Sequence, residues 1–202
     1  ITVTMNPAID KTIDIGALEQ GGLNRIQHVE YDVGGKGINV STILMNLGID
    51  STAFGFAAGF TGEEIIREVE AMGIRSDFIK IDSGISRINL KLKNIDGTEI
   101  NGSGPEISEE KIEELLRKLD ILGEGDILVL AGSIPASMPA DMYSTIMERL
   151  QHKNVTFIVD ATKDLLINVL KYKPFLIKPN NHELGELFDV KLTTREEVIP
   201  YG

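Results

Sequence analysis

The sequence contains no cysteine and no tryptophan, and only 5% of its 202 residues are aromatic. Without cysteine it can form neither disulfide bonds nor thiolate metal sites, which fits a reducing compartment. No run of about 18 apolar residues is present, so we expect no membrane-spanning helix. The start of the chain lacks a basic segment followed by an apolar run, which predicts no signal peptide and a cytoplasmic location. Because Ile1 already lies in a strand-like segment, we expect that one or more residues have been trimmed before it.

Positive charge is scarce, with 20 Lys and Arg against 31 Asp and Glu and a formal net charge of −11. Nucleic acids and anionic membranes are therefore poor partners for the surface as a whole. A small anionic ligand is not excluded, because salt screens charges over about 8 Å. A few local hydrogen bonds from Lys or Arg, each contributing about 1.5–3 kcal/mol, can outweigh distant carboxylates.

The central motif is Gly34-Gly35-Lys36-Gly37, followed at once by an apolar helical pattern that stops at Gly48. Glycines at a helix start let a ligand approach the backbone, and the free N–H groups there favour an anion or a hydroxyl-rich ligand. A P-loop is excluded because Gly37, rather than Ser or Thr, follows Lys36. Val40 occupies the position of the third glycine of a dinucleotide fingerprint. The alternative is a tight turn that only packs a helix on a sheet.

Two kinds of strand pattern alternate with helical patterns along the chain. Four segments with one polar face predict a small sheet: 10–16, 25–33, 86–95 and 98–102. The last two of these segments flank Asp96-Gly97, which is a type I′ hairpin signal. Thr61-Gly62-Glu63-Glu64 reads as a capping box that opens a helix closing at Gly73. Ser108 is expected to cap a further helix.

In the second half, apolar strands alternate with helices, which is typical of a parallel sheet covered on both faces. The strands are expected at 127–130, 155–159 and 175–177, and the helices at 140–150, 165–170 and 182–188. The sequence therefore predicts one α/β domain over residues 1–202, with three α/β/α layers, a mostly parallel central sheet and a small β-sheet lid.

Polar residues follow several predicted strands, where ligands bind in open α/β sheets. They are Asn6, Asp10, Ser133, Asp160 and the stretch from Lys178 to Glu183. Ser133 or Asp160 alone could simply cap a helix. Asp10 suits sugar hydroxyls, with a solvated strand residue as the alternative. Arg87 suits a phosphate, with a surface ion pair as the alternative. The histidines have no metal-ligand spacing, but Glu183 could hold Mg²⁺ through water.

Four motifs in order resemble the ribokinase-like (PfkB) carbohydrate kinases, and most closely the branch of 1-phosphofructokinases and tagatose-6-phosphate kinases. They are Asn6-Pro7-Ala8-Ile9-Asp10, Gly34-Gly35-Lys36-Gly37-Ile38-Asn39, Gly132-Ser133-Ile134-Pro135, and Lys178-Pro179-Asn180 with Glu183. The resemblance covers nearly the whole chain. It implies an ATP-dependent sugar-phosphate kinase with the ribokinase-like fold, converting fructose 1-phosphate to fructose 1,6-bisphosphate.

The resemblance also implies roles for individual residues. Those expected to bind the phosphorylated sugar are Asp10, Gly34, Gly35, Lys36, Asn39, Arg87 and Ser133, with Lys36 and Arg87 on its phosphate. Lys178 and Asn180 are expected to bind ATP. Glu183 and Asp160 are expected near Mg²⁺. The lid is expected to form a homodimer contact.

The family's Gly-x-Gly-Asp motif, which carries the catalytic base, is the main departure. Gly123-Glu124-Gly125-Asp126 has the right letters but precedes a predicted strand instead of a helix. The resemblance therefore implies that the C-terminal third of such an enzyme is missing and that this chain alone has no kinase turnover.

Other functions remain open at this level. Tagatose-6-phosphate kinase has the same mechanism with a different sugar. A non-catalytic sugar-phosphate-binding module would need no base. A dinucleotide oxidoreductase shares the layered fold, but Val40 argues against it.

Overall fold

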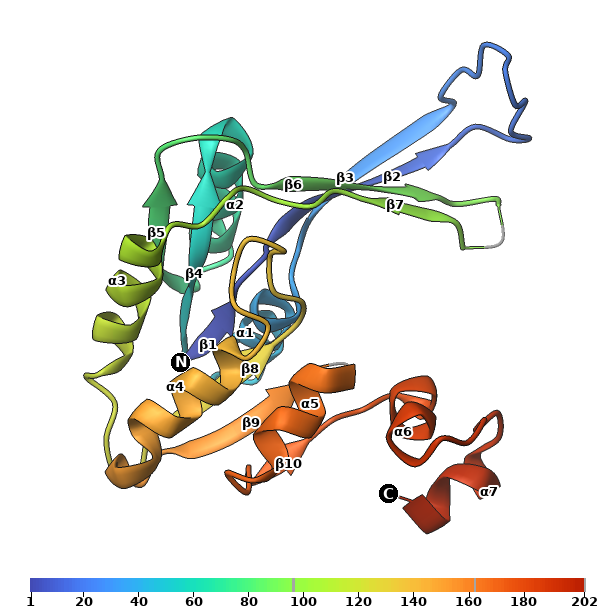
Figure 1. Cartoon of the computed structure of the whole chain (residues 1–202). Coiled ribbons are helices and arrows are strands. Elements are labelled where there is room, and N and C mark those ends of the chain that lie inside the picture. The colour runs from blue at the N-terminus through green and yellow to red at the C-terminus, as the bar shows by residue number, and fades with distance from the viewer. Residues whose placement is uncertain (96, 162, 202) are drawn as a thin grey trace.

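The computed structural model describes residues 1–95, 97–161 and 163–201. Its centre is a six-stranded sheet in which every neighbouring pair of strands is parallel (Figure 1). In spatial order its strands are β10 (Leu176–Ile177), β9 (Thr156–Asp160), β8 (Ile127–Ala131), β1 (Thr2–Thr4), β4 (Thr52–Ala58) and β5 (Arg75–Ile81). The predicted parallel sheet is confirmed.

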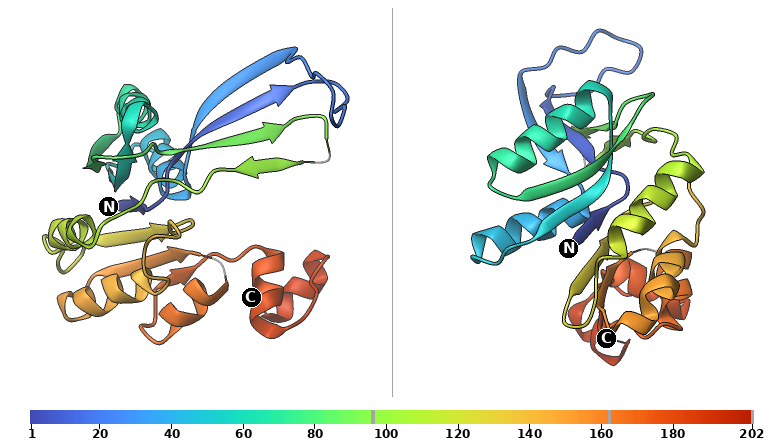
Figure 2. Two further views of the ribbon diagram at one scale, coloured as in Figure 1. Left: turned by 45° about the horizontal axis from the view of Figure 1, so that its top comes forward. Right: turned by 90° about the vertical axis from the view of Figure 1, so that its left-hand side faces the viewer.

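Helices cover both faces of this sheet, and each face has its own apolar core. The right-hand view of Figure 2 shows α1 (Lys36–Asn46) and α2 (Gly59–Ala71) on one side, with α3 (Glu109–Leu119) and α4 (Met142–Leu150) on the other. The larger core packs α3, α4 and α5 (Lys163–Leu170) against residues such as Leu128 and Leu130, which are fully buried. The predicted α/β/α layering is confirmed.

The remaining elements are two short helices at the C-terminal end of the chain and two 3₁₀ turns. α6 (Asn181–Phe188) and α7 (Arg195–Val198) lie beyond β10, and the two short 3₁₀ turns are η1 (Gln151–Lys153) and η2 (Ile199–Tyr201). The sequence patterns predicted α6 but gave no signal for α7 or η2. Within the described ranges, no helix is long and apolar enough to cross a bilayer.

A second, smaller sheet projects away from the body of the molecule (Figure 1). Its four strands lie in the order β3 (His28–Gly34), β2 (Ala8–Asp14), β6 (Arg87–Leu92) and β7 (Glu99–Asn101). The β2–β6 pair is parallel and the other pairs are antiparallel. In the β6–β7 hairpin the Thr98 N–H donates to the Ile95 carbonyl at 2.7 Å. Asp96 of the predicted type I′ turn lies outside the described residues.

The glycine motif sets α1 tightly on the end of β1. Gly35 precedes the helix with a φ of 138°, and the Thr4 hydroxyl accepts a hydrogen bond from the Ile38 N–H at 3.0 Å. A Cβ on Gly37 would lie 2.5 Å from Thr4 Oγ1 and 2.7 Å from the Val3 carbonyl oxygen. Only glycine permits this approach, which brings the first turn of α1 to the carboxyl edge of the central sheet.

The predicted capping box at Thr61 is wrong. α2 begins at Gly59, and Thr61 is a buried residue inside its first turn. The Thr61 hydroxyl donates to the Ser86 carbonyl at 2.7 Å, and the Ser86 hydroxyl accepts from the Ala58 N–H at 3.0 Å. A tertiary contact with the segment that enters β6 has therefore replaced the local cap that the sequence suggested. The predicted end at Gly73 is close, since α2 stops at Ala71 and Gly73 has a φ of 82°.

Ser86 ties the start of β6, and hence the small sheet, to the β4–α2 junction. We predict that Ser86→Ala lowers the free energy of unfolding by about 1–3 kcal/mol, because it leaves the buried Ala58 N–H without an acceptor. Urea denaturation measures this change. Ser83→Ala, in the exposed part of the same loop, is the matched control and is expected to stay within about 0.5 kcal/mol of the parent. Equal stability of both variants would contradict the anchoring role.

Candidate functional site

A cleft of about 450 Å³ opens at the carboxyl ends of the central strands, beneath the small sheet. This is the edge at which open α/β sheets bind ligands, and the volume suits a small molecule. The structure brings most of the predicted site residues to its walls: Asp10, Gly35, Lys36, Asn39, Arg87, Ser133, Asn180 and Glu183. The remaining three, Gly34, Asp160 and Lys178, lie against members of this set.

Asp10 projects from β2 into the cleft and is held by two residues of β6. Its Oδ1 accepts a hydrogen bond from Asn89 Nδ2 at 2.8 Å, and its Oδ2 accepts one from Lys91 Nζ at 2.7 Å. The hydrogen bond to Asp10 is the main cause that raises the pKa of Lys91, and burial opposes it. The Asp10 side chain is only 14% exposed. The carboxylate therefore has a fixed orientation, with lone pairs left over for a ligand.

Gly34 makes room for this carboxylate. A Cβ on Gly34 would lie 2.7 Å from Asp10 Cγ and from each of its carboxylate oxygens. Such distances are far inside van der Waals contact, and the two hydrogen bonds limit how far Asp10 can move. Packing against Asp10 therefore explains why position 34 is a glycine. This explanation is separate from the ligand contact that the resemblance implies for Gly34.

Arg87, the first residue of β6, is half-buried at the inner end of the cleft. Its Nε donates to the Asn6 carbonyl at 3.0 Å, and among the described residues no carboxylate forms an ion pair with it. Burial lowers its pKa, which the charge of Asp10 partly opposes. The described residues therefore do not place Arg87 in the surface ion pair considered above. Arg87 lines the cleft, where a guanidinium can bind an anion.

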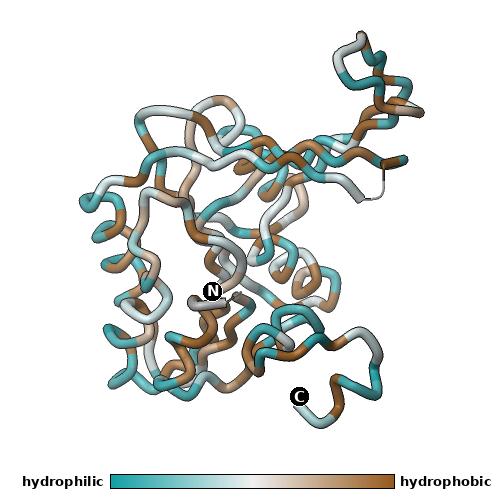
Figure 3. The backbone as a smooth tube through the Cα atoms, turned by 45° about the vertical axis from the view of Figure 1, so that its right-hand side comes forward, coloured by the Kyte–Doolittle hydropathy of each residue, from teal (hydrophilic) through white to brown (hydrophobic). Residues whose placement is uncertain are grey.

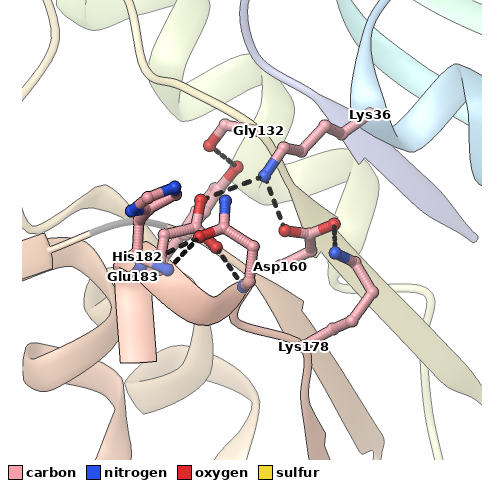
Figure 4. A network of polar contacts seen from close by, with 8 residues as sticks. Lys36, Gly132, Asp160, Lys178, His182 and Glu183 are labelled. Carbon is pink, nitrogen blue, oxygen red and sulfur yellow. Dashed lines mark hydrogen bonds and ion pairs between the residues drawn. The ribbon is translucent and has the colours of Figure 1, made fainter. Parts of the chain in front are cut away.

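Four charged residues form a compact network on the opposite side of the cleft (Figure 4). Lys36 Nζ lies 2.7 Å from Asp160 Oδ1 and 3.7 Å from Glu183 Oε1. Lys178 Nζ lies 3.1 Å from the second Asp160 oxygen. Both carboxylate side chains are 9% exposed. Lys36 is thus engaged by carboxylates at the sheet edge, and it lines the same cleft as Arg87, with which the resemblance groups it.

Asn180 and Glu183 form the N-terminal cap of α6. Asn180 Oδ1 accepts from the backbone N–H groups of His182 and Glu183, each at 2.9 Å, and Glu183 Oε2 accepts from the Asn180 N–H at 2.8 Å. This reciprocal capping box fixes the Glu183 side chain and leaves Oε1 directed toward Lys36. The Asn-x-x-Glu spacing has therefore a structural function as well as the ligand function that the resemblance implies.

A buried tyrosine forms a hydrogen bond with the loop after β8. The Tyr143 hydroxyl donates to the Gly132 carbonyl at 3.0 Å, and the pKa of Tyr143 is raised by burial and, to a smaller extent, by the charge of Asp160. Ser133, the next residue, is exposed at the cleft wall and does not cap a helix. The Asp160 carboxylate forms ion pairs with two lysines, Lys36 and Lys178.

Sequence reasoning missed several residues of the cleft, chiefly Asn89 and Lys91. A usable signal existed, because Arg87, Asn89 and Lys91 alternate with apolar residues along β6 and so share one face. Of these three, only Arg87 is a site candidate in the sequence motifs. Asn6 follows a strand in sequence, and the structure adds it to the site because it is buried and lines the cleft.

The segment Gly123-Glu124-Gly125-Asp126 lies where the sequence analysis expected it, directly before a strand. It leads into the amino end of β8, and the Gly123 N–H donates to Asp126 Oδ2 at 2.9 Å. The cleft lies at the other end of that strand, where Gly132 and Ser133 follow Ala131. Asp126 is therefore on the opposite edge of the sheet from Asp10 and Arg87.

The contact between Gly34 and Asp10 leads to a direct test. We predict that Gly34→Ala displaces the Asp10 carboxylate and lowers the free energy of unfolding by about 1–3 kcal/mol through overpacking. Denaturant unfolding and a crystal structure of the variant measure the two effects. Gly123→Ala is the control, since a Cβ there meets nothing within 4 Å. An unchanged Asp10 position with parental stability would show that the site does not require a glycine here.

The chain is similar to several known proteins. The chain is 45% identical to the 1-phosphofructokinase of Bacillus subtilis over its whole length, and 38% identical to the D-tagatose-1-phosphate kinase of Bacillus licheniformis over 98% of it. It spans 66% and 65% of those proteins, so about two thirds of their length. A crystal structure from Staphylococcus aureus assigned as a phosphofructokinase matches with a TM-score of 0.81 and 42% identity, covering 100% of this chain and 65% of that one. The model of the pfkB family of carbohydrate kinases matches residues 3–202. The chain therefore belongs to the pfkB family of carbohydrate kinases.

Proposed function

We propose that this chain binds the phosphorylated sugar in an ATP-dependent kinase that converts fructose 1-phosphate to fructose 1,6-bisphosphate. The observation that supports this most directly is that one cleft contains both a fixed carboxylate at Asp10 and the Arg87 guanidinium, which forms no ion pair among the described residues. The relatives named 1-phosphofructokinase support the same activity, and this chain covers about two thirds of their length. The activity of the whole protein is part of the proposal.

The sugar-binding side of the cleft suits a phosphorylated ketose. Asp10 accepts hydrogen bonds from sugar hydroxyls with the lone pairs that Asn89 and Lys91 leave free. Arg87 binds the phosphate already on the substrate through its terminal nitrogens, since a guanidinium matches phosphate geometry. Asn39 and the free N–H groups at the start of α1 complete the wall with neutral donors. These contacts orient the acceptor hydroxyl toward the nucleotide side.

The lysine–carboxylate network suits the nucleotide and its metal ion. Within the described ranges, no group of three or more His, Asp or Glu residues could hold a metal by itself. Mg²⁺ needs no such cage, because it binds one or two carboxylates together with water and substrate phosphates. The Lys36 ammonium already lies between Asp160 and Glu183, and these contacts support the proposal that a cation binds at this position. Asp160 and Glu183 would therefore hold the ion, and Lys178 and Asn180 would contact the ATP phosphates.

In the proposed reaction the chain acts by positioning and by charge stabilisation. Mg²⁺ would supply a charge that stabilises the transferring phosphoryl group. Lys178 binds the nucleotide phosphates, while Asp10 and Arg87 keep the acceptor hydroxyl aligned with them. The general base is not among the described residues in this proposal, because Asp126 lies at the opposite edge of the sheet.

One observation favours a second substrate. The B. licheniformis relative is named for tagatose 1-phosphate, whereas the sequence motifs suggested tagatose 6-phosphate as the alternative. Both relatives thus name a ketose that carries its phosphate at carbon 1. D-tagatose 1-phosphate is accordingly the second candidate acceptor for the same cleft and the same residues.

Arg87 provides the test of substrate binding. We predict that Arg87→Met raises the Kd for fructose 1-phosphate by about tenfold to a hundredfold, since it removes charged hydrogen bonds to the phosphate. Isothermal titration calorimetry of the 202-residue chain measures this, with D-tagatose 1-phosphate titrated in parallel. Arg75→Met is the control, because Arg75 is exposed and lies at the amino end of β5. Failure of the parent chain to bind either sugar phosphate would contradict the proposed function.

We further propose a homodimer that forms through the outer face of the small sheet, the face turned away from the cleft. By strand alternation and register this face is mostly apolar, with Lys11 beside Tyr31 as its charged residue, and Figure 3 shows the alternating colours along these strands. Tyr31 and Ile100 are about 60% exposed there, and Ile88 and Val29 about 40%. A projecting sheet with one apolar face needs a cover, and a second copy provides a self-complementary one.

The oligomeric state tests this surface. We predict that Ile100→Lys raises the dimer dissociation constant at least about tenfold, because it places a charge in the centre of an apolar contact. Sedimentation equilibrium over a concentration series measures the constant. Ile121→Lys makes the same change at an isoleucine that is 75% exposed outside the small sheet and should leave it unaltered. A parent chain that stays monomeric at high concentration would contradict the proposal.

A further inference from the structure

We infer that Lys91 and Asn89 are positioning residues for the sugar site: together they fix the Asp10 carboxylate in the orientation that accepts the substrate hydroxyls. The inference rests on the proposed function for the identity of the ligand, but its structural part concerns only residues of this chain. It assigns a function to two cleft residues for which neither the motifs nor the resemblance gave one.

The strand register sets up this arrangement. Asp10 on β2 is the direct partner of Asn89 on β6, and two residues further along Lys91 is paired with Thr12. Residues 87, 89 and 91 point to the same side of the small sheet because side chains alternate along a strand. Asn89 is therefore beside the Asp10 carboxylate, and the longer Lys91 reaches back to it. Each of the two carboxylate oxygens receives one donor, at 2.8 Å and 2.7 Å.

Within the part of the chain that the structure describes, no other side chain fixes this carboxylate. Gly34 lies against it on the β3 side and has no side chain that could support or hydrogen-bond it. Among the described residues, the hydrogen bonds to Asp10 come from Asn89 and Lys91 alone. Removing the lysine would leave Oδ2 without a donor and allow the carboxyl plane to rotate. The remaining lone pairs would then no longer face the bound sugar.

Charge gives Lys91 a second effect on the same group. A phosphate bound at Arg87 would be repelled by the nearby Asp10 carboxylate, and repulsion is strong in a partly buried cleft. The Lys91 ammonium, in direct contact with Asp10, compensates that charge. Glu99 and Asp32 also face Lys91, and their charges help to keep it protonated. Asp10 can thus bind hydroxyls without weakening the binding of the anionic end of the ligand.

Asn89 has a feature that packing does not explain. The residue is 7% exposed, and its Oδ1 is buried without a hydrogen-bond partner among the described residues. A buried unpaired carbonyl destabilises the fold, so an apolar residue would be the more stable choice at this position. An amide is nevertheless suited to the position, because it donates to the carboxylate while remaining neutral. Asparagine at 89 is therefore explained by its donation to Asp10.

A double-mutant cycle separates positioning from direct phosphate binding. Calorimetric titrations of the 202-residue chain use fructose 1-phosphate and, separately, inorganic phosphate. We expect Lys91→Met to raise the Kd for fructose 1-phosphate about tenfold to a hundredfold. The Kd for inorganic phosphate should rise clearly less, because only the uncompensated charge of Asp10 then acts on the phosphate. In an Asp10→Asn background, Lys91→Met should have almost no further effect, because the lysine acts through Asp10.

Two further variants complete the design. Lys91→Arg, which can still donate to the carboxylate, should restore at least part of the affinity for fructose 1-phosphate. Lys93→Met makes the same charge change two residues further along, at an exposed position outside the cleft, and should match the parent. Weaker binding of inorganic phosphate by Lys91→Met, equal to the loss for the sugar phosphate, would overturn the inference. An additive effect in the Asp10→Asn background would do the same.

Crystal structures without ligand test the structural part independently. We expect the Asp10 carboxylate to rotate or to become disordered in Lys91→Met and in Asn89→Ala, while the backbone of β2 is unchanged. An Asp10 carboxylate that keeps its orientation in both variants would refute the positioning role, whatever the titrations show. If the parent chain binds no sugar phosphate, the proposed function is wrong, and the crystal structures still decide whether Lys91 and Asn89 position Asp10.

Discussion

The close packing of α1 on β1 is the constraint on which the rest of the site depends. Gly37 lies against the Val3 carbonyl and the Thr4 hydroxyl, and that hydroxyl accepts the Ile38 N–H. Any side chain at position 37 would push the helix away from the sheet edge. The packing places the free N–H groups of α1 and the Lys36 side chain above the ends of β1 and β8. Lys36 then reaches Asp160 on β9, two strands from β1.

The cleft shows how a strongly acidic chain can bind an anion. Two carboxylates at the cleft are neutralised within the structure, Asp10 by Lys91 and Asp160 by Lys36 and Lys178. Arg87 is the cation left without such a partner among the described residues. The local field at Arg87 is therefore attractive for a phosphate even though the net charge of the chain is −11. Short distances and burial determine this outcome, because solvent screens the more distant carboxylates.

The sequence was sufficient to predict the layered fold and the edge where the site lies. Apolar strands alternating with helices imply a parallel sheet, and the residues after such strands meet at one edge. Contacts that side chains make with other elements could not be predicted from the sequence, because they depend on the order of the strands in space. The partner of Lys36 is one example, since β9 lies beside β8 only after folding. The Thr61 hydroxyl is another, because its partner Ser86 arrives from a distant segment. Asn89 and Lys91 could have been found from the period of β6, since they share a face with Arg87.

The order of strands in the central sheet also bears on how the chain acquires its structure. β1 is synthesised first but lies in the interior of the sheet, between β4 and β8. Its pairing with β4 can form early, whereas its pairing with β8 joins Thr2 to Val129. At a translation rate of about 5–20 residues per second, β8 is synthesised on the order of ten seconds after β1. Until β8 is made, the backbone N–H and C=O groups along the edge of β1 that pairs with β8 have no strand partner, as at any exposed sheet edge.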